Sequence, residues 1–309
     1  MKVFLSGGTG FVGSFLTGRL AEAGHQVTIL TRSKQDGRAV PQGVSLLAGD
    51  PTIPGDWQQK VADHDAIINL AGESIFNRWT TKTKGLIRQS RILTTRNIVQ
   101  ALCSRKGAAT ELLSASAVGY YGFREDEIVD EYGHSGNDFL ALVSQAWEAE
   151  ATRAEDLGVR VVLCRFGIVL GRDSGALKKM VPIFKMGLGS PLGSGKQWFP
   201  WIHEQDLVNI LLFLMDRKDI SGPVNCVAPN PVRNREMTKI LGQVLGKSTF
   251  MPSVPGWALR LGMGEFGTVL LKGQKVVPKR LLDNGFTFQF STIKEALENL
   301  ITHQITRPE

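Results

Sequence analysis

The glycine-rich stretch near the start of the sequence constrains the fold more than any other part of the chain. A short apolar run at residues 3–6 leads directly into Gly7-Gly-Thr-Gly-Phe-Val-Gly13, and apolar residues then recur at helical spacing until Gly24. A second apolar run, residues 26–30, follows at once. A strand, a glycine turn, a helix and a second strand in this order predict the first part of a dinucleotide-binding α/β unit.

The glycines of this stretch have distinct physical roles in such a unit. Glycine permits a tight turn, a close approach of the backbone to a pyrophosphate, and close contact between helix and sheet. The phosphates would then lie on free N–H groups at the helix N-terminus. A glycine-rich turn without a ligand is the alternative. The residues expected to bind the cofactor here are Gly7, Thr9, Gly10, Phe11, Val12 and Gly13.

The end of the second predicted strand indicates which dinucleotide is bound. NAD-binding proteins usually carry Asp or Glu about 20 residues after the glycines, where the carboxylate holds the ribose 2′-OH. Here the sequence is Thr31-Arg32-Ser33-Lys34, with no acid before Asp36. Arg32, with the Ser33 hydroxyl beside it, suits the 2′-phosphate of NADP(H), because a guanidinium binds phosphate through paired, charge-assisted hydrogen bonds. The alternative is that Arg32 is a solvated loop residue.

Length and composition are compatible with one large α/β unit or with such a unit and an added lobe. The chain has 309 residues, of which 42% are hydrophobic and 21% charged, as is usual for a soluble globular protein. Glycine occurs too early for a signal peptide, and the longest apolar stretch, residues 207–215, is too short to span a bilayer. We therefore expect a cytoplasmic protein without a membrane segment.

Cysteine spacing and charge narrow the expected partners. Cys103, Cys164 and Cys226 lack the spacing of a metal site and are expected to be reduced thiols, so no metal is predicted. The net charge of +7 comes without a dense basic run or interleaved aromatic residues. An anionic cofactor and a small-molecule substrate are therefore expected as partners, and nucleic acid is not.

Alternating strand and helix patterns up to about residue 171 predict a doubly wound parallel sheet. Ligands of such a sheet lie beyond the carboxyl ends of its strands. Further strands are expected at residues 44–48, 66–73, 111–116 and 159–165, and helices at 82–106 and 137–157. We add to the cofactor-binding set the residues at the strand ends and the most inward charge of the first long helix: Asp50, Leu70, Ala71, Gly72, Glu73 and Arg91. A loop-capping role for Asp50 and a surface position for Glu73 are the alternatives.

The pattern changes after Gly171. A glycine-rich segment at residues 187–195 precedes Trp198 and Trp201, and is expected to be a mobile segment covering a substrate or, alternatively, a long connection. Several later elements are out of strand–helix rhythm, which favours a smaller C-terminal substrate lobe. The predicted domains are a Rossmann domain at residues 1–171, to which 202–228 return, and a lobe formed by 172–201 and 229–309.

These motifs together resemble those of the extended and atypical short-chain dehydrogenase/reductase superfamily, over essentially the whole chain. The similarity is greatest to its nucleoside-diphosphate-sugar epimerase-like members, often labelled epimerase family or cell-division-inhibitor-like. It implies a Rossmann-type fold, a substrate such as a nucleotide sugar or another carbonyl or hydroxyl compound, and a monomer or homodimer. The motifs are Gly7-Gly-Thr-Gly-Phe-Val-Gly13, Asn69-Leu-Ala-Gly-Glu73, Ser114-Ala-Ser-Ala-Val-Gly-Tyr-Tyr-Gly122, Gly187-Leu-Gly-Ser-Pro-Leu-Gly-Ser-Gly195, Trp201-Ile-His203 with Asp206, and Pro278-Lys-Arg-Leu281.

The catalytic residues of the superfamily are only partly matched. In the superfamily a Ser after the fifth strand orients the substrate, a helical Tyr acts as acid and base, and a Lys four residues later lowers the pKa of that Tyr. Ser116 matches the Ser, but Leu140 and Ser144 occupy the Tyr and Lys positions and can do neither job. Tyr120 and Tyr121 are therefore the candidate acids, with a pKa that a nearby Arg would lower. Aromatic pocket walls are the alternative.

Two functions follow from these residues. The first is an NADP(H)-binding, sugar-nucleotide-epimerase-like oxidoreductase with an altered active site, in which Ser116 polarises a carbonyl or hydroxyl and Tyr120 or Tyr121 supplies the proton. The alternative is a protein that senses the redox state of NADP(H) without turnover. Loss of the Tyr and Lys favours the sensor, and retention of Ser116 favours the enzyme.

Overall fold

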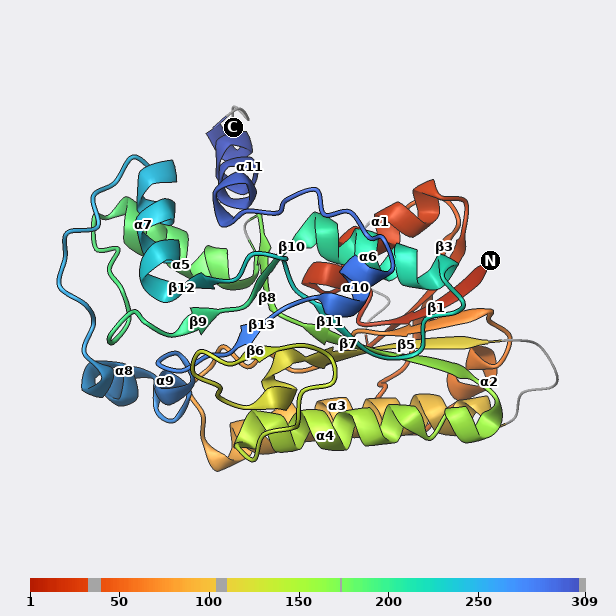
Figure 1. Cartoon of the computed structure of the whole chain (residues 1–309). Coiled ribbons are helices and arrows are strands. Elements are labelled where there is room, and N and C mark those ends of the chain that lie inside the picture. The colour runs from red at the N-terminus through yellow and green to blue at the C-terminus, as the bar shows by residue number, and fades with distance from the viewer. Residues whose placement is uncertain (33–39, 104–109, 173, 306–309) are drawn as a thin grey trace.

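A sheet of seven parallel strands forms the centre of the molecule (Figure 1). The computed structural model describes residues 1–32, 40–103, 110–172 and 174–305, with the backbone alone for 302–305. The strand order is β11-β7-β5-β4-β1-β2-β3. The strands are β1 (Lys2–Ser6), β2 (Gln26–Thr31), β3 (Val44–Ala48), β4 (Ala66–Asn69), β5 (Glu111–Ala117), β7 (Arg160–Phe166) and β11 (Gly222–Cys226). The predicted α/β class with a Rossmann-type parallel sheet is confirmed.

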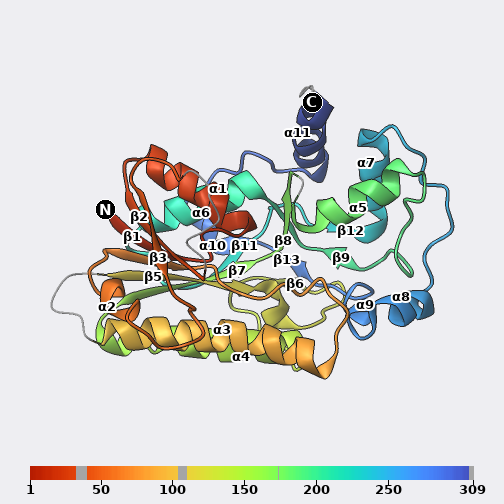
Figure 2. The ribbon, with the colours of Figure 1, turned by 180° about the vertical axis from the view of Figure 1, so that it is seen from behind.

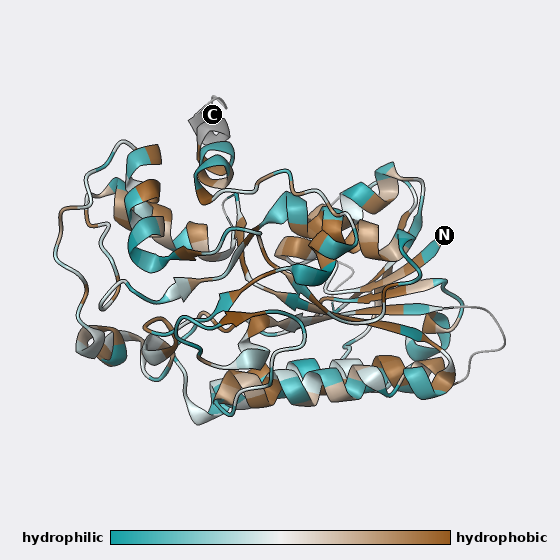
Figure 3. Cartoon of the chain, viewed as in Figure 1, coloured by the Kyte–Doolittle hydropathy of each residue, from teal (hydrophilic) through white to brown (hydrophobic). Residues whose placement is uncertain are grey.

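Helices cover both faces of this sheet (Figures 1 and 2). One face carries α2 (Gln58–Val61), α3 (Thr81–Leu102) and α4 (Phe139–Thr152), and the other carries α1 (Phe11–Glu22), α6 (Glu204–Asp216) and α10 (Lys279–Asp283). Each face has its own apolar core: Phe4, Ile67, Ile98 and Leu112 lie on the first, and Val3, Leu5, Leu20 and Leu211 on the second. Figure 3 shows the resulting pattern, with hydrophobic strands between helices whose polar sides face outward.

The strand order places a ligand crevice at the end of β1 and β4. The chain starts with β1 in the middle of the sheet, adds β2 and β3 on one side, and then crosses to β4 on the other side. The connections after β1 and β4 therefore leave in opposite directions and open a crevice beyond the carboxyl ends of these two strands. Residues 7–13 and 70–73, which follow these strands, meet there.

A second group of elements forms the smaller lobe beside the sheet (Figures 1 and 2). This lobe has an apolar cluster of its own, formed by α5 (Gly175–Lys185), α7 (Asn234–Val244) and α11 (Ile293–Ile305) through residues such as Leu177, Leu241 and Leu297. The remaining elements are η1 (Val118–Tyr121), β6 (Ile128–Val129), η2 (Glu155–Leu157), β8 (Ile168–Gly171), β9 (Trp198–Phe199), β10 (Trp201–His203), β12 (Val232–Arg233), α8 (Gly256–Met263), α9 (Phe266–Val269) and β13 (Lys275–Val276). We propose that the chain divides as predicted into a Rossmann domain and a smaller lobe. The position of β11 supports this division, because β11 lies within the segment 202–228 that was expected to return to the Rossmann domain, and it pairs with β7 of the sheet.

Hydrogen bonds to other parts of the chain hold the glycine-rich segment 187–195 and the segment 287–290 in place. In the glycine-rich segment 187–195, Gly193 N donates to Val254 O at 2.9 Å and Leu192 N donates to the Asn234 side chain at 2.9 Å. The segment 287–290 is held by Asp206, which accepts from Gln289 N at 2.8 Å and Phe290 N at 2.9 Å. Both sets of contacts are typical of fixed connections, which favours the connection over the mobile cover for residues 187–195.

Neither a membrane span nor a metal cluster is found among the described residues. No helix there is both long and apolar enough to cross a bilayer. No group of three or more His, Cys, Asp or Glu side chains in that part of the chain could hold a metal ion.

Candidate dinucleotide-binding site

The glycine loop after β1 leaves no room for side chains at two of its positions. Gly7 has a φ of +75°, and a Cβ there would lie 2.8 Å from Ala71 N and from Leu70 C. A Cβ at Gly13 would lie 2.2 Å from Gly7 O. Only glycine combines this backbone conformation and this close approach. The loop, the first turn of α1 and the end of β4 therefore form one tightly packed unit.

The N-terminus of α1 lies open toward this loop. Gly10 is the N-cap residue, with an extended backbone and no side-chain capping hydrogen bond, and the first turn contains no acid. N–H groups of a first helical turn have no partner within the helix, and the helix dipole places partial positive charge there. The loop and helix end fit the pyrophosphate of a dinucleotide, which is the group such sites hold.

The other residues of the predicted glycine motif differ in what their side chains do. Thr9 is exposed and Val12 packs against the core of the sheet. The ring of Phe11 packs against the backbone at Gly171, where a Cβ would lie 2.2 Å from Phe11 Cζ. This contact fixes the start of α1 against β8, so Phe11 positions the helix whose first turn faces the loop.

The adenine side of the predicted site is only partly described. Arg32 is exposed directly after β2, while Ser33 lies outside the described residues. Asp50 Oδ1 accepts from Thr52 N at 2.8 Å and from Thr52 Oγ1 at 2.6 Å. Asp50 therefore caps its own turn, and contact between Asp50 and an adenine remains a proposal.

Arg91 of α3 lies beside the segment that follows β4. Its Nη1 donates to Glu73 O and to Ile87 O, each at 3.0 Å, and Glu73 N donates to Ser90 Oγ at 3.0 Å. A Cβ at Gly72 would lie 3.2 Å from Arg91 Cζ. Burial lowers the pKa of Arg91 to about 10, and the Glu73 charge opposes this shift. At neutral pH the guanidinium is a cation at the edge of the crevice.

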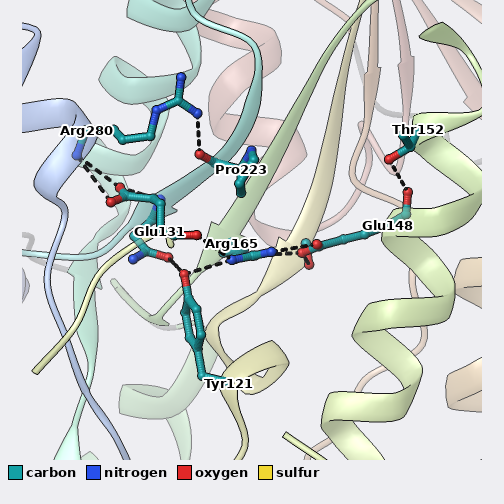
Figure 4. A network of polar contacts seen from close by, with 9 residues as sticks. Tyr121, Glu131, Glu148, Thr152, Arg165, Pro223 and Arg280 are labelled. Carbon is teal, nitrogen blue, oxygen red and sulfur yellow. Dashed lines mark hydrogen bonds and ion pairs between the residues drawn. The ribbon is translucent and has the colours of Figure 1, made fainter. Parts of the chain in front are cut away.

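Figure 4 shows a buried polar network around Arg165 and Glu148, and the hydroxyl of Ser116 joins this network. Ser116 Oγ donates to Glu148 Oε1 at 2.6 Å, and Ser116 is 3% exposed. Glu148 also binds Arg165 through two hydrogen bonds of 2.8 Å, from Nε to Oε1 and from Nη2 to Oε2. The Ser116 proton is thus engaged by Glu148, so the hydroxyl can act toward a substrate only through its lone pairs.

Tyr121 is a second member of this network. Its hydroxyl donates to Asn225 Oδ1 at 2.6 Å and accepts from Arg165 Nη1 at 2.9 Å, and the residue is fully buried. Burial raises the pKa of Tyr121 to about 12, although Arg165 and Asn225 oppose this shift. The predicted lowering of its pKa by an Arg is wrong for Tyr121, because desolvation of the phenolate outweighs the attraction of the guanidinium.

Tyr120 differs from Tyr121 in its surroundings. It is partly buried, and Arg165 Cζ lies 3.6 Å from the centroid of its ring. The Tyr120 and Tyr121 rings meet edge to face with centroids 5.5 Å apart. Guanidinium stacking of this kind fixes the plane of a ring. The face of the Arg165 guanidinium therefore orients the Tyr120 ring, while its N–H groups donate hydrogen bonds to Glu148 and Tyr121.

The network continues to the C-terminal part of the chain (Figure 4). Glu131 accepts from Asn225 N at 3.1 Å and from Arg280 N at 3.2 Å, and its backbone oxygen accepts from Arg165 Nη1 at 3.3 Å. Sequence reasoning missed these partners. The available signals were Arg165 inside an apolar strand and Glu148 on a buried helical face, because a charge in such a place needs a buried partner.

The two α4 positions that correspond to the superfamily Tyr and Lys lie close to this network. The Leu140 Cβ is 3.4 Å from the place a Cβ at Gly119 would occupy, and Ser144 is 4% exposed. Asp138 Oδ1 fixes the start of α4 by accepting from Leu140 N at 3.0 Å and Ala141 N at 3.1 Å. Residue 140 thus faces the turn after Ser116 without a group that can transfer a proton.

Comparison with known proteins assigns the chain to a family. Residues 3–226 match the NAD dependent epimerase/dehydratase family. The chain belongs to this family. Residues 254–300 of this epimerase-family protein match a further domain, described as a domain of unknown function (DUF1731). The predicted resemblance to the epimerase-like branch of the short-chain dehydrogenase/reductase superfamily is confirmed.

Relatives of this epimerase-family protein extend over nearly its whole length. The "Epimerase family protein SDR39U1 homolog, chloroplastic" of Arabidopsis thaliana is 42% identical over 97% of this chain and 87% of the relative. The Bacillus subtilis epimerase family protein YfhF is 36% identical over 99% of this chain and 100% of its own length.

Solved structures show the same fold. The crystal structure of human epimerase family protein SDR39U1 (isoform 2) with NADPH has a TM-score of 0.84 and 33% identity, and the match covers 98% of this chain and 99% of the human chain. A Thermus thermophilus UDP-glucose 4-epimerase in complex with NAD has a TM-score of 0.78 at 19% identity, with 99% of each chain covered. The second likeness concerns the fold alone.

Proposed function

We propose that this epimerase-family protein binds NADP(H) and acts as an oxidoreductase on a small carbonyl or hydroxyl compound, such as a nucleotide sugar. The observation that carries the cofactor assignment is the glycine loop, in which Gly7 and Gly13 allow tight packing against the end of β4 and the first turn of α1, whose N-terminus has no side-chain cap. The human relative crystallised with NADPH supports the phosphorylated dinucleotide. When bound, this cofactor supplies hydride transfer, and the protein supplies orientation and proton transfer.

The cofactor would lie along the residues that meet beyond β1 and β4. The α1 N-terminus and the loop would hold the pyrophosphate, and Arg32 with Ser33 would hold the 2′-phosphate. The segment after β4 would let the cofactor approach its backbone, with Glu73 at a ribose and Asp50 near the adenine. The full proposed set is Gly7, Thr9, Gly10, Phe11, Val12, Gly13, Arg32, Ser33, Asp50, Leu70, Ala71, Gly72, Glu73 and Arg91.

Replacing Arg32 with alanine is expected to weaken NADPH binding by about 10- to 100-fold, because hydrogen bonds to a charged group contribute about 1.5–3 kcal/mol. The exposed position of Arg32 means that its loss leaves the fold intact. NADH, which lacks the 2′-phosphate, should bind the variant and the wild type equally. Isothermal titration calorimetry with both dinucleotides measures the difference. An equal loss for both would contradict the assignment of Arg32 to the 2′-phosphate.

For the chemical step we propose, in the direction of reduction, that Tyr120 donates its phenolic proton to the oxygen of a carbonyl whose carbon receives the hydride, and that Ser116 accepts a hydrogen bond from the hydroxyl group so formed. Ser116 gives its own proton to Glu148, which leaves its lone pairs for a ligand. Tyr121 is the weaker candidate for the acid, because its hydroxyl already forms hydrogen bonds with Asn225 and Arg165 and burial raises its pKa to about 12. Tyr120 is partly buried and held in place by Arg165, as a positioned acid requires.

The Tyr120→Phe variant is expected to lose turnover by about 100- to 10,000-fold, the usual contribution of a positioned general acid. Ser116→Ala should also lose turnover, while NADPH affinity changes little in either variant. Tyr132→Phe is the matched control, because Tyr132 is 76% exposed. Steady-state rates and calorimetry on the same preparations separate turnover from binding. Full activity in Ser116→Ala or Tyr120→Phe would contradict the role of that residue.

The second candidate function is an NADP(H)-sensing protein without turnover. It is favoured by Leu140 and Ser144, which occupy positions where the superfamily carries its acid and its cation. A screen of carbonyl and hydroxyl compounds, including nucleotide sugars, can follow the nicotinamide absorbance of NADPH and NADP+. Turnover at an ordinary enzymatic rate would exclude the sensor. Tight NADPH binding with no turnover of any compound would contradict the oxidoreductase.

A further inference from the structure

The short helix α8 presents large apolar side chains to solvent. None of its eight residues is buried, and Trp257 and Leu261 are 70% and 73% exposed. These two residues are four positions apart, so they lie one above the other on the same side of the helix. A surface helix normally turns its apolar side toward the core and its polar side toward water. The outward side of α8 is therefore apolar where a polar side is expected.

The inward side of α8 is fixed to the rest of the lobe. Met263 packs against a buried apolar cluster, and a Cβ at Gly267 of α9 would lie 2.4 Å from Leu259 O. Residues two positions apart on a helix are separated by about 200° around its axis. Trp257 and Leu261 thus lie on the side opposite Leu259 and Met263. The helix is held by one side, and it presents the other as a defined surface.

The segment before α8 extends this apolar surface. Phe250 is 81% exposed, and Met251 beside it is also exposed. Backbone hydrogen bonds of 2.9 Å, from Val254 N to Pro191 O and from Gly193 N to Val254 O, attach the segment to the lobe. Figures 1 and 2 show α8 and this segment at the end of the molecule opposite β3. Exposed apolar patches in soluble proteins mark sites of interaction with a protein or a membrane.

The charges in this part of the chain are positive. Residues 246–264 contain two cations, Lys247 and Arg260, and no acid. Glu265, the first acid after them, forms an ion pair of 2.9 Å with Lys84. The apolar side of α8 is therefore accompanied by cations, while the nearest following carboxylate already has a counter-charge.

A further cation lies at the C-terminal end of α8. Arg78 is exposed, and its Cγ lies 3.5 Å from the place that a Cβ at Gly264 would occupy. Gly264 follows Arg260 by about one helical turn, so Arg78 and Arg260 border the same end of the apolar side. Apolar and aromatic residues flanked by Lys and Arg are typical of helices that lie in the interface of an anionic membrane.

We infer that α8 and the residues before it dock this protein on an anionic lipid surface. Trp257 and Leu261 would enter the boundary between headgroups and acyl chains, and Arg78 and Arg260 would contact lipid phosphates. This is binding to a membrane surface without crossing it, and it does not depend on the proposed function. A second copy of the chain fits less well. A stable dimer buries about 800 Å² per partner, and a two-fold contact centred on α8 would bring the cations of both copies together.

Co-sedimentation with lipid vesicles tests the inference. The wild type should bind vesicles of phosphatidylcholine mixed with phosphatidylserine about 10-fold more strongly than vesicles of phosphatidylcholine alone, because each cation adds to the attraction. Leu261→Ser and Trp257→Ser should each weaken binding to the mixed vesicles by about 10- to 100-fold, since each removes an inserted apolar side chain. Arg260→Gln should weaken it by about fivefold.

Leu157→Ser provides the matched control, because Leu157 is an exposed leucine on η2, after the C-terminal end of α4. It should bind the mixed vesicles like the wild type, and all four variants should keep the wild-type affinity for NADPH. Equal binding by Leu261→Ser and Leu157→Ser would overturn the inference, as would wild-type protein that does not prefer the mixed vesicles. Light scattering on the same preparations detects the other occupant: a wild-type dimer that Leu261→Ser dissociates would assign the surface to a second copy and overturn the inference too.

Discussion

Replacing Gly13 with alanine is expected to weaken NADPH binding by about 5- to 150-fold. The added methyl group would lie 2.2 Å from Gly7 O and 2.7 Å from Gly8 Cα, both of them backbone atoms. Overpacking of this kind costs about 1–3 kcal/mol. In the variant the loop would shift to relieve the clash, and NADPH binding would have to restore the original loop conformation, so this cost lowers the affinity. The free energy of unfolding should fall by a similar amount. Calorimetry and urea unfolding of the same preparation measure both effects.

Gly18 of α1 supplies the matched control for this substitution. A Cβ at Gly18 would meet nothing within 4 Å. Gly18→Ala should therefore leave the NADPH affinity unchanged and stabilise the protein by about 0.5–1 kcal/mol, because alanine favours the helix. If Gly13→Ala bound NADPH as tightly as Gly18→Ala, the glycine loop could not be the pyrophosphate site.

The Arg165→Met variant is expected to lose about 3–5 kcal/mol of unfolding free energy, the cost of breaking a buried ion pair from one side. Burial works against the charge of Arg165, but hydrogen bonds and charge from Glu148, with a contribution from Tyr121, raise its pKa above the ordinary value. Removing the guanidinium leaves the buried Glu148 carboxylate without its counter-charge and the Tyr121 hydroxyl without its donor. Urea unfolding at neutral pH measures the loss.

A more exposed ion pair, which joins α3 to α4, gives the comparison. Arg96 pairs with Glu150 of α4 at 2.6 Å, and its side chain is 42% exposed. Arg96→Met should change stability far less than Arg165→Met, because water replaces an exposed partner. The double variant Arg165→Met with Glu148→Leu should recover part of the loss, since it removes the orphaned carboxylate. Equal losses in Arg165→Met and Arg96→Met would contradict the buried network.

The sheet and the glycine loop could be predicted from the sequence because both depend on local patterns. Strands buried on two faces are nearly continuous apolar runs, as at β1 and β4, and their parallel arrangement follows from the alternation with helices. The role of Gly13 follows from its spacing after Gly7. Helix ends were less well predicted: the helix expected at residues 137–157 is α4 (Phe139–Thr152), because Asp138 caps it.

The buried network could not be predicted, because its members are far apart in the sequence. Tyr121 and Asn225 are 104 residues apart, and no local pattern indicates that they meet. The direction of the Tyr121 pKa depends on burial, which a position beside Ser116 does not reveal. The short elements of the lobe, such as α8 and β13, were missed for the same reason, since tertiary contacts rather than propensity determine them.

The most direct test of the central claim is a crystal structure of the protein with NADPH. We predict the pyrophosphate within hydrogen-bond distance of backbone N–H groups in the loop and first turn of α1, and the 2′-phosphate beside Arg32. A dinucleotide bound elsewhere, or one whose pyrophosphate makes no contact with residues 7–13, would contradict the account.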